Sequence, residues 1–189
     1  SVRPSGLIAI TLEDKDQLYW VRLTNGNNEI IMVTRQGQAL RIDESDIRSM
    51  GRQAAGVTGI KLKGDDLLAS MDVIEPEGQL LVVTEKGYGK RSKLDEYPAK
   101  GRATGGVATI DQKNLSKIGN ISAARVVQET DEISMISSGG IMLRLKVKDI
   151  SMSGRATRGF KLMDLGSDDV VASVARIVNA EGQKADNGD

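Results

Sequence analysis

The octapeptide Thr84-Glu85-Lys86-Gly87-Tyr88-Gly89-Lys90-Arg91 holds the pattern that decides the fold of this 189-residue chain. It follows a short apolar run, places a glycine in a turn, and has an arginine four residues after that glycine. The pattern occurs twice more, at 34–41 and 138–144, so that Gly37, Gly87 and Gly140 are 50 and 53 residues apart. Glycine at this point supplies the positive φ that a tight hairpin needs. A β-hairpin is therefore predicted about every fifty residues.

Three further signatures keep the same spacing, which makes the repeat strict. A Gly-Arg pair begins 14 residues after each turn glycine, at Gly51, Gly101 and Gly154. An alternating apolar stretch opens each unit, and a second one follows at 18–23, 68–74, 121–127 and 170–177. Alternation of this kind is typical of β-strands. We therefore expect repeat units of about 6–55, 56–105 and 106–158, with a partial unit at 159–178.

Each unit is predicted to supply four short strands, which in the second unit are 57–62, 67–74, Gln79–Thr84 and 89–94. The three extra residues of the third unit fall at 113–120, where we expect a loop. Four-stranded units of this length are typical of blades packed around an axis, so the fold is predicted to be all-β and propeller-like. We expect one domain over 1–178, with the ring truncated at Ser1, and a disordered acidic tail over 179–189.

The composition excludes several kinds of site. The chain has no cysteine and no histidine, so disulfides, thiolate metal sites and histidine bases are excluded. Short apolar runs and the absence of a signal peptide favour a cytoplasmic protein without membrane contact. Asp65-Asp66 and Asp168-Asp169 occupy matching places, where a solvated loop is preferred over a metal site. Because 26 basic and 26 acidic residues balance, nucleic-acid binding would require local clustering of cations.

Residues 84–91, Glu96-Tyr97-Pro98 and Arg102-Ala103-Thr104-Gly105-Gly106-Val107 resemble blades of the gyrase A C-terminal domain family. The resemblance extends from residue 1 to about 178. It implies a β-pinwheel, a propeller-like disc whose blades exchange strands, with duplex DNA wrapped around a basic rim. Sequence preference should be weak, since no recognition helix is evident.

The resemblance also implies that this chain is not itself an enzyme and holds no cofactor. In the family, the DNA-cleaving tyrosine lies in the upstream breakage-reunion region, and ATP and Mg are used on other domains of the topoisomerase. The implied partners are duplex DNA, the breakage-reunion region and the B subunit of an A2B2 enzyme. The implied location is the bacterial cytoplasm, in association with the nucleoid.

The repeat predicts where such a rim finds its cations, because each blade can place arginine or lysine at an equivalent point and neutralise phosphates along a bent path. The predicted DNA-binding residues lie in the fourth strands, in the Gly-Arg junctions and beside the second hairpin turn. They are Arg41, Lys90, Arg91, Lys93, Arg144, Lys146 and Lys148; Arg52, Lys100, Arg102, Arg155 and Arg158; and Lys86 and Tyr88. For the recurring arginines, inter-blade ion pairing is the alternative.

Two other functions stay open from the sequence. A C-terminal domain of the topoisomerase IV A protein would select DNA geometry, and the lack of a complete basic, glycine-rich box at a junction favours that interpretation over gyrase. A propeller-like protein-interaction scaffold would need no DNA at all. The scaffold is disfavoured if cations follow one edge while acidic residues such as Glu44, Asp46, Asp72 and Glu75 collect on the faces.

Overall fold

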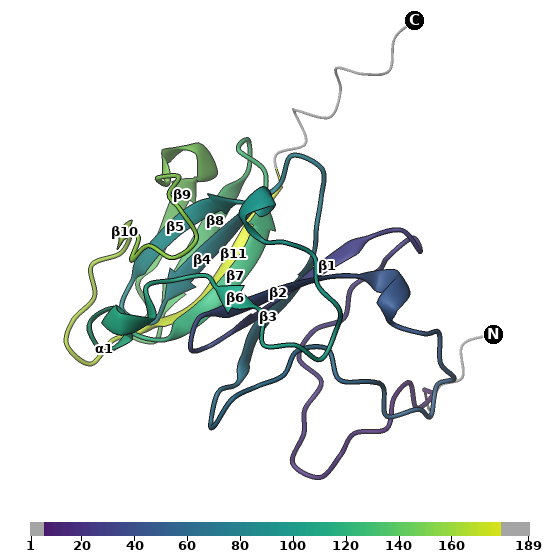
Figure 1. The fold of residues 1–189 in the computed structure, drawn as a ribbon. Coiled ribbons are helices and arrows are strands. Elements are labelled where there is room, and N and C mark those ends of the chain that lie inside the picture. Colours follow the sequence, from purple (N-terminus) through teal and green to yellow (C-terminus); the bar gives the residue numbers. More distant parts are fainter. Residues whose placement is uncertain (1–5, 179–189) are drawn as a thin grey trace, which may run out of the picture.

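The computed structural model describes residues 6–178, and the ordered elements are almost all β-strands (Figure 1). The acidic tail expected at 179–189 lies outside the described residues, as do residues 1–5. Between residues 6 and 178, no helix is long and apolar enough to span a membrane.

The three predicted hairpins are confirmed. They are β1 (Glu29–Thr34) with β2 (Gln38–Asp43), β4 (Gln79–Thr84) with β5 (Tyr88–Lys93), and β8 (Glu132–Ser137) with β9 (Met142–Lys146). The turn glycines Gly37, Gly87 and Gly140 have φ values of 88°, 80° and 87°, the region that only glycine enters without strain. A 3₁₀ turn follows each hairpin, at Glu44–Asp46 (η1), Leu94–Glu96 (η2) and Val147–Asp149 (η4).

The sheets do not coincide with the sequence units, because neighbouring units exchange strands. The other strands are β3 (Leu68–Val73), β6 (Val107–Ala108), β7 (Ile121–Val127), β10 (Phe160–Lys161) and β11 (Val171–Ile177). The strand orders are β3-β1-β2-β6, β10-β5-β4-β7 and β11-β8-β9. Each hairpin thus takes its third strand from the next unit, and the first two sheets take a fourth from the unit after that. This exchange agrees with the predicted β-pinwheel.

The central strand β4 shows how the core is shared between sheets. Leu80 and Val82 point into one apolar cluster, shared with the first sheet, and Leu81 and Val83 point into another, shared with the third. All four side chains are buried, which explains why this strand is a continuous apolar run rather than an alternating one. Burying each such side chain contributes about 1.5–3 kcal/mol.

Two predictions of local structure are wrong. Residues 57–62 form no strand and only an isolated bridge between Ile60 and Thr104, and residues 18–23 form no strand. In the later units the equivalent of 18–23 pairs with the hairpin of the preceding unit, and no hairpin precedes residue 18 within the described residues. The loop expected at 113–120 contains η3 (Gln112–Asn114) and the short helix α1 (Leu115–Ile118), because Ile118 reaches the core.

The packing of the sheets defines an inner and an outer side. Strand β7 packs against both β3 and β11, so each sheet contributes one end strand to the centre of the molecule (Figure 1). The opposite ends of the sheets, at β6, β10 and β9, therefore face outward. We call this side the outer edge.

Candidate nucleic-acid interface

Two junction segments cover the outer edge in the same way. Residues 99–108 run along β2, where the Lys100 amide donates to the Arg41 carbonyl at 2.9 Å. Residues 152–161 run along β5, where the Ser153 amide donates to the Arg91 carbonyl, also at 2.9 Å. The Gly101-Arg102 and Gly154-Arg155 junctions thus lie on the outer edge because the segments that contain them pair with β2 and β5, the second strands of their hairpins.

Seven of the predicted cations are exposed, and all except Lys93, which lines a cleft with Glu75 and Glu77, lie along this edge. They are Lys100 and Arg102 on the first sheet, Lys93 and Arg158 on the second, and Arg144, Lys146 and Lys148 on the third. Arg102 also donates to the Asp46 carbonyl at 3.2 Å and to the Thr58 carbonyl at 3.4 Å, which orients it. Exposed cations therefore occur on all three sheets, although most of them do not occupy equivalent positions of the repeat.

The structure adds three exposed lysines that the hairpin motif does not contain. Lys61 and Lys63 lie beside the first junction, where the Lys61 amide donates to the Thr104 carbonyl at 2.9 Å. Lys161 lies opposite Tyr88 in the β10–β5 pair. The motif gave no signal for them, because their position depends on pairing between distant segments.

Tyr88 lies beneath two of these cations. The Arg158 guanidinium carbon and the Lys161 ammonium nitrogen are each 5.9 Å from the centre of its ring. Such cation–π contacts orient both charges on the outer edge. The Tyr88 ring thus lies next to two exposed cations and is itself partly exposed, and its contact with DNA stays a prediction.

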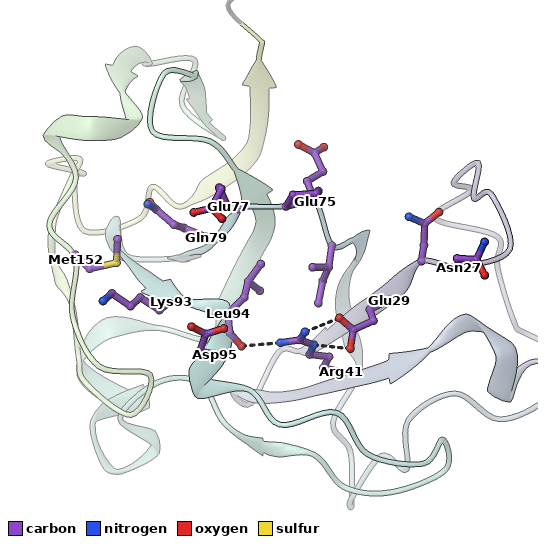
Figure 2. A pocket seen from close by; sticks show the side chains of 14 residues that line it. Asn27, Glu29, Arg41, Glu75, Glu77, Gln79, Lys93, Leu94, Asp95 and Met152 are labelled. Atoms are coloured by element: carbon purple, nitrogen blue, oxygen red, sulfur yellow. Dashed lines mark hydrogen bonds and ion pairs between the residues drawn. The ribbon is translucent and has the colours of Figure 1, made fainter. Parts of the chain in front are cut away.

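Arg41 and Arg91 do not lie on the accessible surface that their prediction requires. Arg41 pairs with Glu29 through two nitrogens and donates to the Leu94 carbonyl of the next unit at 3.0 Å; Figure 2 shows it in a cleft of about 560 Å³. Arg91 donates to the carbonyls of Ile150 at 2.7 Å and Lys148 at 3.1 Å. Both arginines join one unit to the 3₁₀ turn of the next. This inter-blade role is the alternative to DNA binding that the sequence left open.

Arg144 occupies the matching position in the third hairpin and differs from the other two. It pairs with Glu132, as Arg41 pairs with Glu29, but its side chain is 60% exposed against 5% for Arg91. The same sequence position is therefore internal in one unit and solvent-accessible in another. The repeat alone cannot distinguish these environments.

Lys90 is fully buried, so it too is withdrawn from the predicted surface. Its ammonium group donates to the carbonyls of Gly154 at 2.7 Å and Arg155 at 2.6 Å. Burial lowers the pKa of Lys90 to about 8, because removing the ammonium from water disfavours its charged form.

The remaining predicted residues, Lys86, Arg52 and Arg155, differ in their exposure and in their hydrogen-bond partners. Lys86 is exposed in the β4–β5 turn and donates to the Ser116 carbonyl at 2.7 Å. Arg52 is exposed in its junction, beside the Gln53 carbonyl that accepts from Thr11. Arg155 is half-buried and donates to the Ala108 carbonyl at 2.8 Å.

Acidic residues pair with cations on both sides of the molecule. On the outer edge Glu132 pairs with Arg144, and Asp164 pairs with Lys161 at 3.2 Å; on the inner side Asp72 and Glu75 neutralise arginines. Asp72 accepts from Arg22 at 2.9 Å and from Arg125 at 3.0 Å. Glu75 accepts from Arg176 at 2.6 Å, and this bond lowers the pKa of Glu75. Asp72 and Glu75 therefore lie away from the outer edge, whereas Glu44 and Asp46 lie in η1 at the end of β2.

The recurring aspartates between first and second strands act on the hairpin turns. Asp66 accepts from the backbone amide of Gln36 at 2.9 Å, and Asp169 accepts from that of Gly139 at 2.7 Å. The hydroxyls of Ser137 and Ser138 lower the pKa of Asp169 to about 2. Within residues 6–178, no group of three or more acidic side chains is placed to hold a metal ion.

Comparison with known families identifies the repeat. The model of a family described as "DNA gyrase C-terminal domain, beta-propeller" matches residues 28–75, 78–128 and 131–177. Each matched segment begins just before or at a hairpin and ends with the second strand of the following unit. The matches therefore follow the sheets rather than the sequence units.

Individual relatives agree with the family match. The DNA gyrase A protein of Halalkalibacterium halodurans is 52% identical over 179 residues, covering 94% of this chain and 21% of the relative. That of Haloquadratum walsbyi is 41% identical over 174 residues, covering 92% of this chain and 20% of the relative. The chain thus spans about a fifth of the length of these relatives.

Solved structures share the fold. A C-terminal domain of DNA topoisomerase IV superposes with a TM-score of 0.87 at 34% identity, covering 93% of this chain and 55% of that one. A DNA gyrase A C-terminal domain superposes with a TM-score of 0.85 at 29% identity, covering 92% and 59%. Both are similar to nearly the whole of this chain.

Proposed function

Because this chain belongs to the DNA gyrase C-terminal domain family, we propose that it wraps or bends duplex DNA around its outer edge as a non-catalytic part of a gyrase A protein. In this role the domain would contribute to negative supercoiling by the whole enzyme. The observation that carries the proposal is the recurrence of exposed cations on the outer ends of all three sheets.

Physical chemistry supports a wrapping surface over a base-reading one. Phosphate neutralisation with counterion release supplies most of the affinity of such surfaces and is independent of sequence. Bending a few tens of base pairs costs about 1–6 kcal/mol, so contacts must be spread over several blades. The strand exchange holds the three sheets together and thereby fixes the spacing of these contacts.

Gyrase is favoured over topoisomerase IV by sequence similarity. The two curated relatives described above are gyrase A proteins, at 52% and 41% identity. Topoisomerase IV remains the second candidate because its C-terminal domain superposes as well as that of gyrase A. Both candidates bind DNA on this side of the molecule in our proposal.

The surroundings of the domain follow from the same proposal. Its partners would be duplex DNA, the breakage-reunion region of the same polypeptide and the B subunit of an A2B2 enzyme. ATP, Mg and the cleaving tyrosine would belong to those other parts, and the enzyme would act on the bacterial nucleoid in the cytoplasm.

Charge reversal on the outer edge tests the proposal. The variant Lys100→Glu/Arg102→Glu/Arg158→Glu should weaken DNA binding strongly and reduce the slope of log affinity against log salt by about one per lost phosphate contact. The matched control Lys15→Glu/Lys113→Glu/Lys117→Glu changes the net charge equally at exposed sites outside the junction segments 99–108 and 152–161. Equal losses in both variants would contradict a defined DNA path.

A further inference from the structure

The Lys90 side chain makes three hydrogen bonds in addition to the backbone pairing of its strand. Its ammonium nitrogen lies 2.7 Å from the Gly154 carbonyl oxygen, 2.6 Å from that of Arg155 and 3.1 Å from Ser92 Oγ. An ammonium group has three N–H bonds, so these three acceptors use all of its donors. The side chain is therefore held in one position.

The two carbonyls belong to the turn that presents Arg158. The Gly154 carbonyl also accepts from the Thr157 amide at 3.1 Å and from the Thr157 hydroxyl at 2.8 Å, which closes the turn. Ser92 adds a second anchor, since its hydroxyl donates to the Ser153 carbonyl at 2.8 Å. Arg158 follows this turn directly and is exposed.

The first sheet provides an internal comparison without this anchor. Leu40 and Ile42 occupy the positions of Lys90 and Ser92 and are buried among apolar side chains. The corresponding junction turn, at 101–104, keeps the backbone bond to the fourth strand and the Thr104 hydroxyl bond to the Gly101 carbonyl. Of these two sheets, only the second has buried polar side chains, Lys90 and Ser92, that bond to its junction turn.

Lys90 keeps its charge at neutral pH in spite of its burial. Burial is the main effect and lowers the pKa of Lys90 to about 8; Glu96, whose carboxylate accepts from the Arg155 amide at 2.8 Å, favours the charged form, and Arg155 opposes it. The neighbouring Tyr97 hydroxyl pairs with Thr109 at 2.7 Å. The first sheet has the apolar Leu40 at this position and so avoids the cost of burying a charge, which points to a positional role for the Lys90 ammonium.

We propose that Lys90 is a positioning residue for DNA binding, which fixes the 154–157 turn so that Arg158 faces the duplex, and that Lys90 does not touch DNA itself. The inference rests on the proposed function, since it assigns a role within the same outer edge. It also explains why a lysine stands at a buried position that holds Leu40 in the first unit.

Backbone hydrogen exchange tests the anchor without DNA. In Lys90→Met, which keeps the length and removes the donors, amide protection at 153–158 should fall about tenfold or more, while protection at 100–105 stays unchanged. Ser92→Ala removes the second anchor and should give a smaller loss at the same residues, so it serves if Lys90→Met does not fold. Unchanged protection at 153–158 in either folded variant would overturn the inference.

A double-mutant cycle tests the link to DNA. Lys90→Met should weaken DNA binding several-fold when Arg158 is present and have no further effect in an Arg158→Ala background, while its effect should persist in an Arg102→Ala background. Additive effects with Arg158→Ala would show that Lys90 acts independently and would overturn the inference. If the unchanged chain binds no DNA, the proposed function fails, and the exchange experiment still decides whether the anchor exists.

Discussion

Individual arginines at one repeat position have different energetic roles. Arg91→Ala should destabilise the fold by about 2–4 kcal/mol, because it leaves the buried carbonyls of Ile150 and Lys148 without their donor. Arg144→Ala should cost less than about 1 kcal/mol, since its pair with Glu132 is exposed. Both losses in the free energy of unfolding can be measured by urea denaturation, provided that the variants have equal m-values. Equal losses would contradict the inter-unit role of Arg91.

Lys90 predicts a specific dependence of stability on pH. Burial lowers its pKa from 10.5 to about 8, so between these pH values the unfolded chain binds a proton that the folded chain does not. The free energy of unfolding should therefore rise as the pH increases across this window. This gain should be lost as the pH falls back through 8. Relative to Lys90→Met, the wild-type free energy of unfolding should increase by about 3 kcal/mol from pH 7.5 to 10.5. A flat difference would contradict the buried ammonium.

At the scale of elements, the hairpin turns differ in how well they tolerate replacement of their glycine by alanine. Gly87 and Gly140 share a positive φ, but a Cβ at Gly87 would collide with the Met163 carbonyl, and no described atom lies near one at Gly140. Gly140→Ala should cost about 1–2 kcal/mol from backbone strain alone, and Gly87→Ala about 3 kcal/mol or more. Thermal unfolding of the two variants distinguishes these terms. Equal shifts would mean that the collision is relieved elsewhere.

Strands could be predicted from the sequence where their pattern was local. The hairpins follow from alternation and glycine placement, and the exchange of strands was implied by the family resemblance. The first strands form only in part: β6 and β10 are two residues long and pair with the distant β2 and β5, whereas residues 57–62 form only an isolated bridge. Helix α1 was missed because four residues carry no periodicity, although Ile118 is buried in the core.

At the scale of the whole molecule, the sequence predicted a basic outer edge more successfully than it predicted which residues form that edge. The junction cations Lys100, Arg102 and Arg158 are exposed on the outer edge, as a rim requires. Lys90 and Arg91 are not, since their donors are used by the carbonyls of the next unit. Period-two alternation places a side chain on a face of its sheet, but it does not say whether another unit covers that face.

The central claim is that DNA follows the outer edge across several sheets. The most direct test measures binding of the chain to duplexes of about 40 and 150 base pairs across a salt series, with end-to-end fluorescence transfer to report bending. We predict affinity that falls steeply with salt and increases with duplex length, together with shortened end-to-end distances on the longer duplex. An absence of binding at low salt would contradict the account and favour a protein-interaction scaffold.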